Sequence, residues 1–72
     1  MDKEKFYNTV YNQVEAYFNS FSKKPHYLEV NSQFDLSKCI DPEDLKHYDN
    51  NSFKGMTIVR TPDISSDKVL VY

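Results

Sequence analysis

Hydrophobic and polar positions follow two different periods along this chain, and the period changes near residue 25. In the first part, apolar residues recur in steps of three and four, which stacks side chains on one face of a helix. Asp2 is a suitable N-cap, and Pro25 cannot continue a helix, so the pattern predicts one long amphipathic helix from residue 3 to residue 21. Its apolar positions are Phe6, Tyr7, Val10, Tyr11, Val14, Tyr17, Phe18 and Phe21.

The apolar stripe of this helix is wide, because several of its members are adjacent pairs such as Tyr17 and Phe18. Either the whole stripe packs on the domain's own sheet, or one edge is left for a second copy or another protein. Tyr7, Tyr11 and Phe18 would form that edge. Tyrosine suits an interface because its ring can be buried while its hydroxyl stays hydrated.

After residue 26 the apolar residues alternate with polar ones, as in strands that are buried on one face. This pattern predicts a strand at 27–31, then a bend and a short extended piece at 33–36. Residues 55–61 and 68–72 read as two further strands. We expect these last two strands to pair as an antiparallel hairpin.

The stretch from Asp41 to Leu45 has the signature of a helix start, with Pro42 in the first helical position and acidic residues in the first turn. It predicts a short helix at 42–48, with Leu45 and Tyr48 pointing inward, followed by a loop at 49–52. The acidic residues have two interpretations. They either cap the helix and face solvent, or they form a partner-binding acidic patch of Glu43, Asp44 and Asp49.

Together these elements predict a single α+β domain over residues 1–72. Its long N-terminal amphipathic helix packs on a small antiparallel sheet of about three to four strands, with one short additional helix near 42–48. The expected core consists of Phe6, Val10, Val14, Tyr17, Phe21, Leu28, Val30, Phe34, Leu36, Leu45, Ile58, Val69 and Val71.

The composition offers little material for catalysis or metal binding. A domain of 72 residues buries only about 60% of its unfolded surface, so a disulfide, a metal or a partner often reinforces it. Cys39 is the only cysteine, which excludes an internal disulfide, and with His26 and His47 it matches no zinc spacing. We expect Cys39 to be a small buried filler beside Ile40. The chain is therefore expected to be no enzyme and to hold no metal and no cofactor.

Charge and hydropathy disfavour nucleic acid and a membrane as partners. The net charge of −2 provides no basic field for nucleic acid, and Lys23, Lys24 and His26 are too few for a nucleic-acid patch. No continuous apolar run indicates a membrane span, and a single cysteine favours a reducing cytoplasm.

The last predicted strand, Val69 to Tyr72, is apolar throughout, so we expect it either in the centre of the sheet or paired with a second chain through an edge that includes Tyr72. Eight lysines to one arginine, with six asparagines, indicate an AT-rich genome such as that of a low-GC bacterium or its phage. The leading hypothesis is a non-enzymatic protein-binding accessory or regulatory factor, such as a phage or mobile-element inhibitor. Its partner would be a host protein that it modulates or a protein of the same operon. The alternatives are a structural homodimer and, third, a weak nucleic-acid binder.

Overall fold

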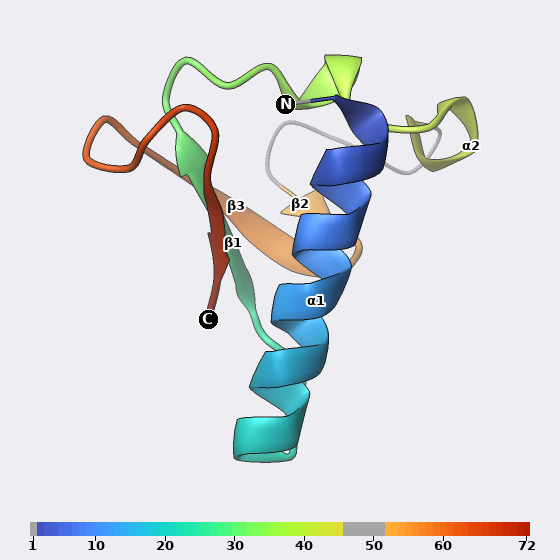
Figure 1. Cartoon of the computed structure of the whole chain (residues 1–72), viewed down its shortest axis with the longest axis vertical. Coiled ribbons are helices and arrows are strands. Elements are labelled where there is room, and N and C mark those ends of the chain that lie inside the picture. The colour runs from blue at the N-terminus through green and yellow to red at the C-terminus, as the bar shows by residue number, and fades with distance from the viewer. Residues whose placement is uncertain (1, 46–51) are drawn as a thin grey trace.

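One long helix packs against one face of a four-stranded sheet, which confirms the α+β class (Figure 1). The computed structural model describes residues 2–45 and 52–72. The elements are α1 (Lys3–Phe21), β1 (Tyr27–Asn31), the 3-10 turn η1 (Leu36–Lys38), α2 (Pro42–Leu45), β2 (Ser52–Phe53), β3 (Met56–Thr61) and β4 (Val69–Val71).

The bounds of α1 agree with those predicted from the sequence. The Asp2 carboxylate caps the helix by accepting a hydrogen bond of 2.8 Å from the Lys5 backbone N–H. At the other end, Ser22 adopts a left-handed conformation with φ of 58°, and its N–H donates to the Phe18 carbonyl. Pro25 follows and is buried. Local capping therefore defines both ends of α1.

The sheet has the order β2-β3-β1-β4 and is mixed, since β1 pairs in parallel with β3 and antiparallel with β4. The expectation that the last two strands pair with each other is wrong, because β1 lies between them. Its side chains Leu28 and Val30 are fully buried, which is typical of a central strand. Alternation along a strand shows which side chains face the core, but it does not identify the neighbouring strand.

Strand β2 was not expected, because residues 49–52 read as a loop. Its register with β3 pairs Phe53 with Met56, so Lys54 and Gly55 form a two-residue hairpin turn. Both turn residues have positive φ, 50° and 82°, as a type I′ turn requires. Gly55 adopts this conformation without strain, which is why the only glycine of the chain lies there.

The extended piece predicted at 33–36 is also wrong, since a turn and η1 occupy this region. In this region, side-chain oxygens accept hydrogen bonds from the backbone N–H groups, a role that a neighbouring strand would have in a sheet. The Asn31 side chain accepts from the Gln33 N–H at 2.8 Å, and Asp35 accepts from the Ser37 N–H at 3.1 Å. The short helix is confirmed at Pro42–Leu45. Residues 46–48 and the side chains of Leu45, Tyr48 and Asp49 lie outside what the structure describes.

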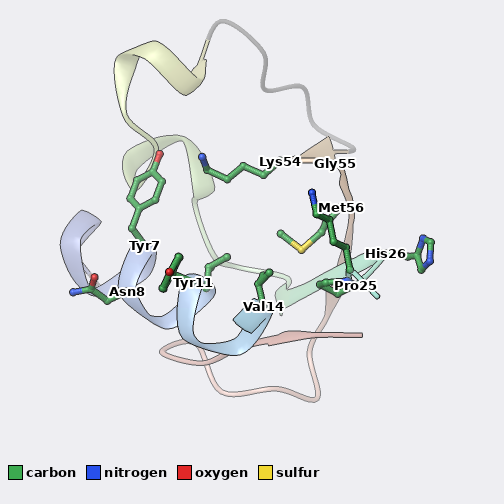
Figure 2. A pocket seen from close by; sticks show the side chains of 11 residues that line it. Tyr7, Asn8, Tyr11, Val14, Pro25, His26, Lys54, Gly55 and Met56 are labelled. Atoms are coloured by element: carbon green, nitrogen blue, oxygen red, sulfur yellow. The ribbon is translucent and has the colours of Figure 1, made fainter. Parts of the chain in front are cut away.

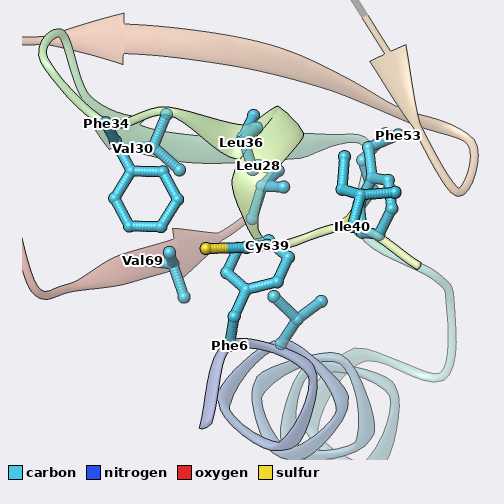
Figure 3. Close-up of a cluster of buried hydrophobic side chains, with 11 residues drawn as sticks. Phe6, Leu28, Val30, Phe34, Leu36, Cys39, Ile40, Phe53 and Val69 are labelled. Atoms are coloured by element: carbon cyan, nitrogen blue, oxygen red, sulfur yellow. The ribbon is translucent and has the colours of Figure 1, made fainter. Parts of the chain in front are cut away.

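The core lies between α1 and the sheet, and Phe6 is at its centre (Figure 3). The Phe6 ring centroid lies 5.8 Å from that of Phe34 and 5.9 Å from that of Phe53. Seven predicted core residues are buried, and three more pack partly against them. The buried seven are Phe6, Val10, Leu28, Val30, Phe34, Leu36 and Val69, and the partly buried three are Val14, Ile58 and Val71.

Some core predictions were wrong or incomplete. Phe21 was expected inside but is 60% exposed, because the last part of α1 extends beyond the strands (Figure 1). Tyr17 is only half-buried, and its ring centroid lies 4.6 Å from that of Phe21. Cys39 is buried as expected, and Ile40, Phe53, Met56 and Ile64 are buried core residues that were not predicted.

Candidate functional site

A groove of about 710 Å³ lies between α1 and the turn that joins β2 to β3 (Figure 2). Tyr11 and Val14 line it from α1, and Met56 and Pro25 line it from the sheet side. Two lysines, Lys24 and Lys54, also line it, as does His26, whose ring points away from the others in Figure 2. The volume falls within the range of about 300–1,000 Å³ that is typical of ligand-binding clefts.

Tyr7 closes one end of the groove and also holds the fold together. Its hydroxyl donates to the Asp44 carboxylate at 2.5 Å and accepts from the Asp41 N–H at 2.9 Å, which links α1 to α2. Burial, and then the hydrogen bond to Asp44, raise the pKa of Tyr7 to about 12. The ring of this predicted binding residue lines the groove, whereas its hydroxyl is engaged within the domain.

Lys54 lies opposite Tyr7 in Figure 2. Its Nζ is 3.7 Å from the Asp44 carboxylate and 5.8 Å from the ring centroids of both Tyr7 and Phe53. The lysine and the aspartate are both partly exposed, so this ion pair adds little stability. It does hold the Lys54 ammonium group beside the groove.

The predicted acidic patch is partly engaged within the domain. Lys3 Nζ lies 2.7 Å from the Asp41 carboxylate, and Asp44 is bonded to Tyr7 and paired with Lys54. Glu43 is exposed. Asp49, the third predicted member, lies outside the described residues, so of the two described members Glu43 is exposed and Asp44 is engaged within the domain.

An exposed aromatic stripe continues from the groove along α1. Tyr11 is 68% exposed, Phe18 is 51% exposed and Phe21 is 60% exposed, while Val14 between them is half-buried. These four residues are spaced by three and four, so they share one face of the helix, and we call them the α1 stripe. The structure therefore brings two of the predicted binding residues, Tyr11 and Phe18, onto one surface beside Tyr7.

Tyr72, another predicted binding residue, lies apart from the α1 stripe. The backbones of Tyr72 and Tyr27 are hydrogen-bonded to each other, and the two rings stack with 5.3 Å between their centroids. The Tyr72 hydroxyl donates to the Glu29 carboxylate at 3.0 Å. These residues alternate with Leu28 and Val30 along the strands, so they lie on the sheet face opposite α1.

Strand β4 is at an edge of the sheet, and Gln13 of α1 closes that edge. The Gln13 side-chain amide donates to the Val69 carbonyl and accepts from the Val71 N–H at 3.1 Å, as a neighbouring strand would. Neither sequence alternative foresaw this arrangement, in which a side chain takes the place of a paired strand. A signal was present, because Gln13 is a polar residue on the same helix face as Phe6, Val10 and Tyr17.

The described part of the chain contains no group of three histidine, cysteine, aspartate or glutamate residues placed to hold a metal ion. Cys39 is buried, and burial raises the pKa of its thiol, which disfavours the nucleophilic thiolate. None of the helices in residues 2–45 and 52–72 combines the length and the apolar content needed to cross a bilayer.

Comparison with known proteins found no matching family model, no matching curated protein and no matching solved structure.

Proposed function

We propose that this chain is a non-enzymatic accessory or regulatory factor that acts by binding another protein through the groove and the α1 stripe. The observation that carries the proposal is the exposure of Tyr11, Phe18 and Phe21 on one face of α1, continuous with an apolar groove. Clustered exposed aromatic residues are typical of protein interfaces, where they act as anchors that bury a large area.

The shape of this surface supports protein binding over a purely structural role. A helix face beside a groove is a common mode of recognition, in which a partner helix places its apolar residues in the groove. The AT-rich composition supports an origin in a phage or another mobile element of a low-GC bacterium, and the single cysteine supports a cytoplasmic setting. In this setting the partner is a host protein that the chain modulates or inhibits.

The same stripe favours one second candidate, a homodimer in which the projecting ends of two α1 helices pack together. Phe21 is the last residue of α1, and Phe18 lies about one turn before it, at the end of the helix that extends beyond the strands (Figure 1), where a second copy can approach. A homodimer predicts a melting temperature that rises with protein concentration, and a constant melting temperature would exclude it.

The proposal is tested with the double variant Tyr11→Ser/Phe18→Ser and the control Tyr72→Ser, which removes one exposed aromatic ring from the opposite sheet face. Each immobilised protein is incubated with nuclease-treated lysate of a low-GC bacterium, and the bound proteins are identified by mass spectrometry. We expect one stoichiometric partner on the wild type and on the control, and its loss on the double variant. A partner retained by the double variant, with both variants folded, would contradict the proposal.

A further inference from the structure

Among the described residues that line the groove, the charged side chains are both lysines. Lys24 and Lys54 come from two separate segments, and none of the described residues that line the groove is acidic. The chain as a whole has 11 acidic and 9 basic residues, so a lining with lysines alone differs from the average surface of this protein. An arrangement of this kind attracts carboxylates, and it repels a basic ligand.

Lys54 is available to a ligand although it has a partner within the domain. Its Nζ lies 3.7 Å from the Asp44 carboxylate, and the two side chains are 50% and 31% exposed. An ion pair this accessible to water is weak, so a carboxylate of a bound ligand can share or replace it at little cost. The ammonium group also lies beside the Tyr7 and Phe53 rings, and these contacts keep it at the groove whether the ion pair is shared or replaced.

The apolar part of the site has the periodicity of a helix. Tyr11, Val14 and Phe18 are spaced by three and four residues, and from Tyr7 to Phe18 the helix advances by about 16 Å. Such a row packs well against the matching row of a second helix. Gln13 closes the β4 edge at the other side of the sheet from the groove, which disfavours an added strand at that edge.

From these observations we infer that the groove binds an acidic amphipathic helix of a partner protein, whose apolar face contacts Tyr11, Val14 and Met56 and whose carboxylates pair with Lys24 and Lys54. This inference rests on the proposed function and specifies the chemistry of the partner. It selects an acidic helix over a basic one and over an uncharged apolar segment.

The test uses synthetic helices of about 16 residues, long enough to span the groove. One has leucines on one face and glutamates flanking them, the second has every glutamate replaced by lysine, and the third has every leucine replaced by serine. Binding is measured by fluorescence anisotropy at physiological salt, and the contact surface is mapped by NMR shifts of the labelled protein. We expect the acidic helix to bind about tenfold more tightly than the lysine version, with shifts at Val14, Gly55 and Met56.

Two matched protein variants test whether the preference for the acidic helix depends on the charge of the groove or on the net charge of the protein. Lys24→Glu/Lys54→Glu changes two groove lysines, whereas Lys23→Glu/Lys68→Glu makes the same net change at two exposed lysines outside the groove lining. We expect the first variant to lose the preference for the acidic helix and the second to retain it. Circular dichroism verifies that both variants are folded.

Three results would overturn the inference: equal binding of the acidic and lysine helices, a preference that survives in Lys24→Glu/Lys54→Glu, or shifts confined to the sheet face of Tyr27 and Tyr72. Failure to bind either helix would also overturn it. If both helices bind equally and Tyr11→Ser/Phe18→Ser abolishes both, the acidic partner is excluded while the proposed function stands. If the lysate experiment also shows no dependence on Tyr11 and Phe18, the proposed function fails as well.

Discussion

Two faces of α1 carry apolar residues at steps of three and four but have opposite surroundings. On one face, Phe6 is 0% exposed and Val10 is 4% exposed, and both pack against the sheet. On the α1 stripe, Tyr11 is 68% exposed although it directly follows Val10, and Phe18 is 51% exposed. Phe21 is 60% exposed at the end of the helix, which extends beyond the strands (Figure 1). Helical periodicity thus identifies the two faces, and the position and extent of the sheet determine which of them is buried.

This difference assigns two roles to one helix. The buried face contributes to the stability of the fold, since its side chains leave water when the chain folds. The α1 stripe contributes less to folding and retains apolar area that a partner can bury. Substitutions on the two faces should therefore differ in their effect on the free energy of unfolding.

The largest effect is expected for Phe6→Ala, which leaves a cavity in the middle of the core. Truncation of a buried phenylalanine lowers the free energy of unfolding by about 3–5 kcal/mol, a large fraction of the stability of a small domain. Phe18→Ala is the matched control on the α1 stripe and should change the free energy of unfolding by less than about 0.5 kcal/mol. Urea unfolding followed by circular dichroism measures both, and equal losses would contradict the division of α1.

A smaller loss is expected for Tyr7→Phe, which keeps the ring but removes the hydroxyl that bonds to Asp44 and Asp41. Loss of these bonds should lower the free energy of unfolding by about 1–2 kcal/mol. Tyr11→Phe is the control, because Tyr11 is 68% exposed on the next turn of the helix. Similar losses in the two variants would show that the Tyr7 hydroxyl does not link α1 to α2.

The raised pKa of Tyr7 also predicts that the free energy of unfolding falls at alkaline pH. Its pKa is raised from 10.0 to about 12 in the folded protein, so folding favours the neutral hydroxyl. The resulting stabilisation is complete below pH 10, and it is lost as the pH rises through the folded pKa of about 12. Unfolding measured at a series of alkaline pH values should show this loss in the wild type and a smaller loss in Tyr7→Phe. Identical pH profiles for the two proteins would contradict it.

Gln13→Ala tests the closed edge of the sheet. It removes both hydrogen bonds of the Gln13 amide to β4 and should cost about 1 kcal/mol, since water can replace part of the interaction. The freed edge of β4 should also favour association between chains, detected by light scattering as a mass that rises with concentration. Gln33→Ala, at an exposed loop position, should do neither. A strictly monomeric Gln13→Ala with full stability would show that the amide does not protect the edge.

The features that depend on neighbours in sequence were predictable. The cap at Asp2 and the apolar steps of three and four predicted the bounds of α1, and alternation predicted β1 at residues 27–31. The start of α2 at Pro42 followed from local chemistry in the same way. In each case the relevant contacts lie within a few residues, so the sequence contains the complete signal.

The features that depend on distant contacts were not predictable. The insertion of β1 between β3 and β4 joins segments that local patterns cannot relate, and the exposure of Phe21 depends on where the strands end. The groove has the same origin, because its walls combine α1 with the turn at Lys54 and Gly55. The sequence predicted Tyr11 and Phe18 as members of one binding surface, but it did not predict that Lys24 and Lys54 line a groove beside them.

The most direct test of the division of α1 is the free energy of unfolding of Tyr11→Ser/Phe18→Ser, measured by urea titration beside the wild type and Phe6→Ala. We predict that the double variant lies within about 0.5 kcal/mol of the wild type, because both residues are more than half exposed to water. A loss comparable with the roughly 3–5 kcal/mol expected for Phe6→Ala would show that the stripe belongs to the core, and it would contradict the account.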